Sequence, residues 1–200
     1  TNAEYSGPVS LRDAISQPFV SLVTFSPPFF NGDATDAITL NSELILNRPM
    51  TLDGSGAFAG VIISGNNATR VLNLGSGANV ALDSLSIVHG NSGSDAGAGI
   101  LVDGGARLEL DRCLIADHVT SYVGGGLMLF NGTVVVSNST FARNTADDGA
   151  AIWAQGSSSL QLTHATVSGN TGGDAILSFI GASLENCIVA GNSAGNFAEL

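Results

Sequence analysis

Acidic residues recur at two places in this sequence where their side chains could take part in chemistry. Asp83 and Asp111 each follow a short apolar segment, and the equivalent later positions hold Ser137, Thr163 and Glu185. If these segments stack as neighbouring strands, the first two carboxylates lie about 5 Å apart, a separation at which one carboxyl pKa can rise. Paired carboxylates serve polysaccharide lyases and hydrolases as acid and base. Ordinary solvated strand ends are the alternative interpretation, since hydroxyls follow in the same column.

The second acidic set occupies turns that precede glycine- and alanine-rich segments. Stacked acidic turns could bind calcium through carboxylate oxygens. The spacing, however, lacks the Gly-Gly-x-Gly-x-Asp nonapeptide of calcium-binding β-rolls, and Asx turns explain aspartates there equally well. We therefore expect no resident cofactor and keep calcium as the alternative at four residues, which are Asp95, Asp147, Asp148 and Asp174.

Histidine and cysteine give no sign of a transition-metal site. The three histidines fall at different places within the repeat described below, and no His-x-x-x-His or Cys-x-x-Cys pair occurs. Cys113 and Cys187 hold the same repeat position three repeats apart, which separates them by on the order of 14 Å. We expect two buried thiols rather than a disulfide.

Charge and aromatic content limit the class of partner. The formal net charge is −11, with 17 acidic residues against six basic ones. This balance argues against nucleic acid and anionic membranes, and no apolar run is long enough for a membrane helix. Trp153 alternates with Ile152 and is expected to face outward, so Trp153, Asp83 and Asp111 are the expected contacts with a protein or carbohydrate partner.

The elements that carry these residues are repeats. An apolar residue recurs with spacings of 24, 28, 26, 26 and 22, at Ile63, Ile87, Ile115, Phe141, Val167 and Val189. Three residues after it stands an amide in most copies and a histidine once, at Asn66, His118, Asn144, Asn170 and Asn192. We expect these five side chains to form a stacked ladder, because a buried amide needs hydrogen-bond partners in every coil.

Three short β segments per repeat predict a parallel β-helix, with a hairpin meander as the competitor. Segments of three to five alternating apolar residues are separated by Gly, Asn, Asp, Ser or Pro, and helical periodicity is absent. One exception is 10–17, where Ser10 and Asp13 form a capping signal for a short helix that covers the open end of the stack. We expect one all-β domain over 1–200, with 1–36 as the N-terminal cap region and 37–200 as coils of 22–28 residues.

Two motifs resemble those of known proteins. Phe141-Ala142-Arg143-Asn144 followed by Gly149-Ala150-Ala151-Ile152 resembles the F-x-x-N and G-G-A-I repeats of chlamydial polymorphic outer membrane proteins and related bacterial β-helix surface proteins. Ser10-Leu11-Arg12-Asp13-Ala14 resembles the C-S-L-R-E-A element of secreted bacterial β-helix proteins, with Val9 in place of Cys and Asp13 in place of Glu. The resemblance implies an extracellular, right-handed β-helix that is adhesin-like.

Two functions follow as hypotheses. The first is a non-enzymatic scaffold, extracellular or on the cell surface. The alternative is a carbohydrate-active enzyme, lyase or hydrolase, or a carbohydrate-binding module with an acidic face and calcium. Because the chain stops at 197–200, partway through a coil, we also expect a longer parent chain or end-to-end self-association at the C-terminal coil.

Overall fold

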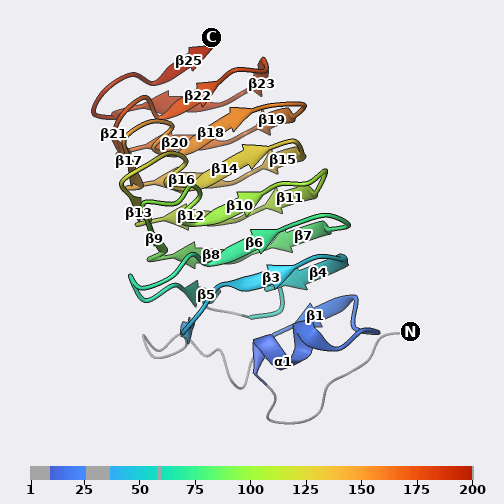
Figure 1. The fold of residues 1–200 in the computed structure, drawn as a ribbon. Helices are drawn as coiled ribbons and strands as arrows, with labels where there is room; N and C mark the ends of the chain where they lie inside the picture. The colour runs from blue at the N-terminus through green and yellow to red at the C-terminus, as the bar shows by residue number, and fades with distance from the viewer. Residues whose placement is uncertain (1–9, 26–36, 58–59, 200) are drawn as a thin grey trace.

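The computed structural model describes residues 10–25, 37–57 and 60–199, and in them the chain forms a right-handed parallel β-helix of about six turns (Figure 1). Every strand pairs in parallel with the equivalent strand one coil away. The predicted fold class is therefore confirmed and the hairpin meander is wrong. Residues 1–9, including Val9, and residues 26–36 of the expected cap region lie outside the described residues.

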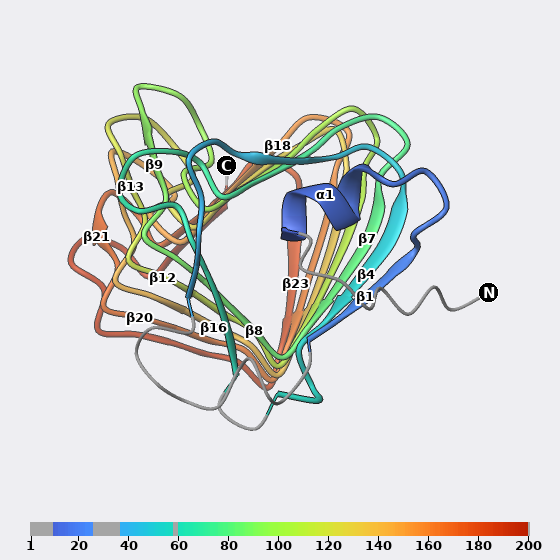
Figure 2. The ribbon, with the colours of Figure 1, turned by 90° about the horizontal axis from the view of Figure 1, so that it is seen from below.

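Three seven-stranded sheets form the sides of the helix (Figure 2). The first sheet contains β1 (Leu22–Thr24), β4 (Pro49–Asp53), β7 (Asn79–Asp83), β11 (Arg107–Asp111), β15 (Thr133–Ser137), β19 (Ser159–Thr163) and β23 (Ala182–Glu185). The second contains β2 (Ala37–Thr39), β5 (Val61–Ser64), β8 (Leu85–Val88), β12 (Leu114–Ala116), β16 (Thr140–Ala142), β20 (Thr166–Ser168) and β24 (Ile188–Ala190). The third contains β3 (Leu44–Leu46), β6 (Leu72–Leu74), β10 (Ile100–Val102), β14 (Leu127–Phe130), β18 (Ile152–Gln155), β22 (Ile176–Ser178) and β25 (Phe197–Glu199).

The recurring apolar residues lie on the second sheet and fill the core. Ile63 pairs with Ile87, and the column continues in register to Ile115, Phe141, Val167 and Val189. Phe141 is fully buried between its neighbours above and below. Each such side chain contributes about 1.5–3 kcal/mol through removal from water. The predicted repeat register is confirmed at all six positions.

The corner between the first and second sheets is a single residue in the left-handed conformation. Its φ is 56° at Ser84, 52° at Arg112, 49° at Asn138 and 53° at both His164 and Asn186. This conformation costs a non-glycine residue about 1–2 kcal/mol, so its recurrence shows that stacking dictates the corner geometry. The corner also places each of these side chains directly beside the last residue of a first-sheet strand.

The predicted N-terminal helix is present as α1 (Leu11–Ser16) and covers the lower end of the stack (Figure 2). Ser10 and Asp13 form the capping box, and the buried face comprises Leu11, Ala14 and Ile15. Arg48, from the first full coil, donates to the carbonyls of Ile15 and Gln17 at 2.6 and 2.7 Å. The cap is therefore held by apolar contact and by bonds to the C-terminal end of the helix.

A fourth sheet, which the sequence reasoning did not predict, occupies the corner between the second and third sheets. It contains β9 (Asn91–Gly93), β13 (Val119–Thr120), β17 (Thr145–Ala146) and β21 (Thr171–Gly172). The corner is longest where this sheet begins: Ile87 and Ile100 lie 13 positions apart, whereas Ile63 and Leu72 lie only nine apart. The added residues have room to pair because successive long corners stack on one another.

Candidate functional site

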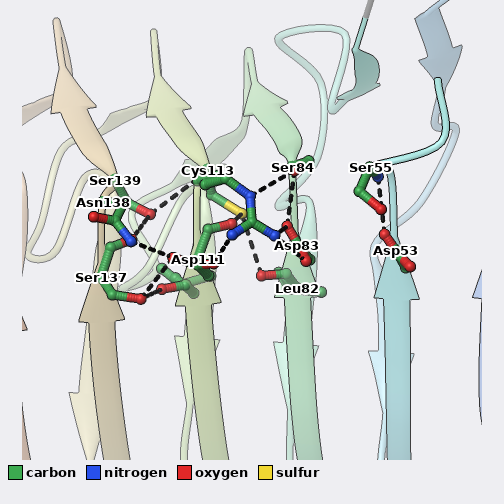
Figure 3. Close-up of polar contacts among 12 residues, drawn as sticks. Asp53, Ser55, Leu82, Asp83, Ser84, Asp111, Cys113, Ser137, Asn138 and Ser139 are labelled. Atoms are coloured by element: carbon green, nitrogen blue, oxygen red, sulfur yellow. Dashed lines mark hydrogen bonds and ion pairs between the residues drawn. The ribbon is translucent and has the colours of Figure 1, made fainter. Parts of the chain in front are cut away.

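The predicted carboxylate column exists on the outer face of the first sheet (Figure 3). Asp83 pairs in register with Asp111, as expected, and Ser137 follows in the next strand. Asp53 extends the column on the other side of Asp83. The sequence reasoning missed Asp53, although it follows Met50-Thr51-Leu52 as Asp83 follows Val80-Ala81-Leu82. Three carboxylates therefore stand on three consecutive strands.

Arg112 neutralises two of these carboxylates from its corner position. Its Nη2 donates to Oδ1 of Asp83 at 2.6 Å, its Nη1 donates to Asp111, and its Nε reaches the Ser84 hydroxyl at 3.2 Å. A depression of about 450 Å³ lies beside Arg112, but neither carboxylate lines it. The pair is thus part of an ion-paired surface network and does not face this depression.

Asp111 keeps its charge in this network. A hydrogen bond from Nδ2 of Asn138 at 2.7 Å is the largest influence and lowers the pKa of Asp111 below its usual range. Partial burial opposes this effect, and the Ser137 hydroxyl and the Arg112 guanidinium reinforce it. The expectation that a like-charged neighbour raises a carboxyl pKa is therefore wrong for Asp111, because the hydrogen bonds from Asn138 and Ser137, together with the charge of Arg112, favour the ionised form. An acid that is ionised at neutral pH cannot protonate a leaving group.

Four of the five expected ladder residues form one hydrogen-bonded column. The side-chain oxygen of Asn144 accepts from the backbone N–H of His118 at 3.2 Å. In the same way, the side-chain oxygen of Asn170 accepts from the N–H of Asn144 at 3.0 Å. The side-chain oxygen of Asn192 accepts from the N–H of Asn170, also at 3.0 Å. Each amide nitrogen also donates to a second-sheet carbonyl of the preceding coil, with Nδ2 of Asn144 3.0 Å from the oxygen of Ile115. The ladder thus ties each coil to the next beside the core.

His118 reproduces both bonds of an asparagine with its two ring nitrogens. Nδ1 accepts from the backbone N–H of Gly90 at 2.8 Å, and Nε2 lies 2.9 Å from the carbonyl oxygen of Ile87. A backbone N–H can only donate and a carbonyl can only accept, so the ring must be neutral with its proton on Nε2. Complete burial lowers the pKa of His118 to about 3, which agrees with a neutral ring.

Asn66 is not part of the ladder, so this prediction is wrong. Its side chain is exposed and its φ is 55°. In later coils the left-handed residue, such as His89 or Asp117, comes one position before the ladder residue. In this coil Asn66 itself is left-handed, so the turn is displaced by one residue. In the next coil the ladder position is Gly90. A Cβ there would approach the Ala98 carbonyl oxygen to 2.1 Å and Nδ1 of His118 to 2.6 Å, so only glycine fits beneath the imidazole ring.

The four aspartates considered for calcium do not come together. Asp148 and Asp174 lie on adjacent coils, since Ala150 N–H bonds to the Asp174 carbonyl. A whole coil containing Val123 separates Asp148 from the loop of Asp95, as the bonds of Gly97 to Val123 and of Gly124 to Asp148 show. Over residues 10–25, 37–57 and 60–199, no group of three or more His, Cys, Asp or Glu side chains is placed to hold a metal ion.

Trp153 points outward from the third sheet, as its alternation with Ile152 predicted, but it is not an exposed contact. Only 9% of the residue is accessible, because it packs with Met128 and Leu177 in a small apolar cluster outside the sheet. Its ring lies 5.5 Å from that of Phe179, centroid to centroid. The expected surface role of Trp153 is therefore wrong, and Phe179 is the exposed aromatic of this cluster.

Both cysteines are unpaired thiols, but Cys187 is only half-buried, so the expectation of two buried thiols is wrong for Cys187. Cys113 is buried behind the carboxylate column, and its sulfur donates to the carbonyls of Leu82 and Asp111 at 3.4 and 3.3 Å. Burial raises the pKa of this thiol to about 11, so it remains protonated and unreactive.

The sequence reasoning did not predict a cleft beside the fourth sheet. It has a volume of about 540 Å³ and lies below the first strand of the fourth sheet, lined by Ser42, Glu43, Asn67, Ala68, Thr69, Arg70, Asn91, Ser92, Gly93 and Asp95. Nη1 of Arg70 pairs with Glu43 at 2.5 Å within it. The available sequence signal was the step in repeat spacing from 24 to 28 residues, which marks the place where the corner lengthens.

Comparison with known proteins identifies the fold family. In the part of the chain that is described, no helix has the length and hydropathy needed to cross a membrane. Neither the curated proteins nor the solved structures gave a significant match. The family model described as a right handed beta helix region matches residues 50–198, about three quarters of the sequence. The chain therefore belongs to the right-handed β-helix family.

Proposed function

We propose that this chain is a non-enzymatic β-helix scaffold, extracellular or on the cell surface, with an adhesin-like role. The observation that carries the proposal is the state of the carboxylates expected to do chemistry. Arg112 binds both Asp83 and Asp111, and neither carboxylate lines the depression beside Arg112. A substrate would have to displace a cation from both groups before either could act.

The repeat motif Phe141-Ala142-Arg143-Asn144 followed by Gly149-Ala150-Ala151-Ile152 supports the extracellular role, because it resembles repeats of bacterial surface proteins. Three of its positions also have a structural role. Phe141 fills the core, Asn144 belongs to the ladder, and Gly149 adopts a φ of 55° where a Cβ would lie 2.6 Å from Cβ of Trp153. Because the motif serves stacking, the outer faces remain free for other residues. This division suits a scaffold whose partner, protein or carbohydrate, binds outside.

A turnover assay tests the proposal. The full chain is incubated with neutral and uronic acid polysaccharides, with and without calcium, and new chain ends are measured. We expect no turnover, and no change in melting temperature on addition of EDTA. Turnover that disappears in Asp111→Asn but persists in Glu185→Gln, which occupies the same column three strands away, would replace the scaffold by a lyase or hydrolase.

Location is tested separately. Antibody labelling of intact source cells and of their culture medium should detect the chain outside the cytoplasm. Detection only after cell lysis would contradict the extracellular part of the proposal, whatever the turnover assay shows.

A further inference from the structure

The cleft below the fourth sheet arises from a change in coil length. The corner that contains Asn67 and Thr69 is short, and the next corner carries four more residues and forms β9. The longer corner therefore overhangs the shorter one. The overhang makes the roof of the cleft, and residues 67–70 and 42–43 form its other walls.

Each wall is fixed by hydrogen bonds in the absence of ligand. Arg70 donates through Nε to the Gly97 carbonyl and through Nη2 to the Ala96 carbonyl, both at 2.9 Å, while it pairs with Glu43. Arg12 of the cap helix holds the carbonyls of Ser42 and Glu43 at 2.5 and 2.9 Å. The cleft is therefore preorganised, which reduces the entropy that binding would cost.

The roof is braced from the coil above. The Thr120 hydroxyl is 2.7 Å from the carbonyl oxygen of Asp95 and 3.1 Å from that of Gly93. The Ser92 hydroxyl also bonds to the Asp95 carbonyl, at 2.6 Å. These bonds use the backbone oxygen of Asp95 and leave its carboxylate facing solvent.

Some of the lining groups have hydrogen-bonding capacity to spare. Within the described residues, the side chains of Asn67, Thr69 and Asp95 have no hydrogen-bond or ion-pair partner. An amide, a hydroxyl and a carboxylate together offer both donors and acceptors. The lining contains no aromatic side chain and, apart from Ala68, no apolar one, so an apolar ligand would gain little there.

From this lining we infer that the cleft binds a neutral saccharide, the end or a short run of a neutral glycan. Hydroxyl groups, which both donate and accept, match the three free side chains. The volume of about 540 Å³ falls within the range of small-molecule sites. The inference rests on the proposed function only in that it names the partner of the scaffold.

Charge selects against an acidic glycan. Arg70 is neutralised by Glu43, which leaves the charge of Asp95 uncompensated within a chain of net charge −11. A uronic acid or sulfated polymer would bring further negative charge against this carboxylate. The cleft should therefore prefer neutral sugars over acidic ones of the same length.

The test uses the full chain and immobilised gluco-, manno- and galacto-oligosaccharides, with oligogalacturonate and a lysine-rich peptide as the anionic and cationic probes. Affinity is measured for Asn67→Gly and Asp95→Asn. We expect at least one neutral oligosaccharide to bind more tightly than either charged probe. Each substitution should weaken that binding about three- to tenfold, the loss expected for one hydrogen bond.

Matched variants separate the cleft from the rest of the surface. Asn66→Gly changes the adjacent residue, which has the same φ of 55° but does not line the cleft, and Asp147→Asn removes an equivalent exposed charge elsewhere. Both should keep wild-type affinity. The inference is overturned if no neutral sugar binds, if the lysine-rich peptide binds best, or if all four variants behave alike. Any of these results leaves the scaffold proposal standing, because that proposal depends on the turnover and location assays.

Discussion

A ladder residue of this β-helix must supply two groups at once: an acceptor for the backbone N–H of the preceding coil and a donor for a strand carbonyl. Asparagine does so with one amide, and His118 does so with two ring nitrogens. Asn144 additionally donates to the side-chain oxygen of Asn170 at 3.0 Å. His118 has no second donor for the side-chain oxygen of Asn144 in the following coil, which accepts from the His118 backbone N–H instead. Gly90 in the preceding coil has no side-chain donor, so the single acceptor Nδ1 of His118 serves the Gly90 backbone N–H alone. The pairing of histidine with glycine is therefore consistent in both size and hydrogen bonding.

Replacement of Asn144 tests the energetic weight of the ladder. Asn144→Ala leaves the buried N–H of His118 and the carbonyl of Ile115 without these partners, at about 1–3 kcal/mol each. The free energy of unfolding, measured by urea denaturation, should fall by about 2–6 kcal/mol. Asn66→Ala is the control and should cost about 1–2 kcal/mol, for its left-handed φ alone. Equal losses in the two variants would contradict the ladder's role.

Buried His118 should make stability depend on pH. Its pKa is lowered to about 3 in the folded chain, against about 6.5 when unfolded, so the unfolded chain binds the additional proton between these values. The contribution of His118 is thus complete above about pH 6.5 and is lost at about 1.4 kcal/mol per pH unit as the pH falls toward 3.

His118→Asn separates this effect from the titration of carboxylates. Asparagine supplies the same two bonds without a titratable ring, so the variant should lose less stability than wild type between about pH 7 and about pH 4. Denaturation curves at several pH values measure the difference. The exposed His164 provides the control, since His164→Asn should keep the wild-type slope. A slope unchanged in His118→Asn would refute the assignment.

At the scale of elements, the sequence predicted which strand residues stack from coil to coil, but not which corner segments cover the faces of the sheets. Ile87, Ile115 and Phe141 occupy one column, so each coil independently repeats the same signal. The pairing of Asp83 with Asp111 followed from the same register. The alternation of inward and outward residues along the strand correctly placed Trp153 on the outer face. It carries no information about the corner residues that pack against that face and bury the side chain.

Corners lack the hydrophobic period that identifies strands, which explains the remaining errors. Counting three residues from Ile63 selects Asn66, but the turn of that coil is displaced by one residue. The fourth sheet and the Glu43–Arg70 cleft depend on contacts between corners of unequal length, and residues 27 positions apart in sequence meet there. Arg112 was overlooked for a related reason, since its bridging role depends on the left-handed corner that directs its side chain toward both aspartates.

At the scale of the molecule, net charge opposes the stability supplied by stacking. A formal charge of −11 on 200 residues creates self-repulsion in the folded chain. Salt also screens the favourable ion pairs. Pairs such as Arg143–Asp117, in which the side chains are 58% and 29% exposed, contribute little, so their loss should be the smaller effect.

Added salt should therefore stabilise this protein. Between about 0.01 M and 0.1 M ionic strength the Debye length falls from about 30 Å to about 10 Å, which removes most repulsion between distant acidic residues. We expect the melting temperature to rise over this range, as followed by circular dichroism. In Asp147→Asn with Asp148→Asn, two exposed charges are removed and the rise should be smaller. A melting temperature that falls with salt would mean that the ion pairs outweigh the repulsion, and that the Arg112 network contributes more to stability than its exposure indicates.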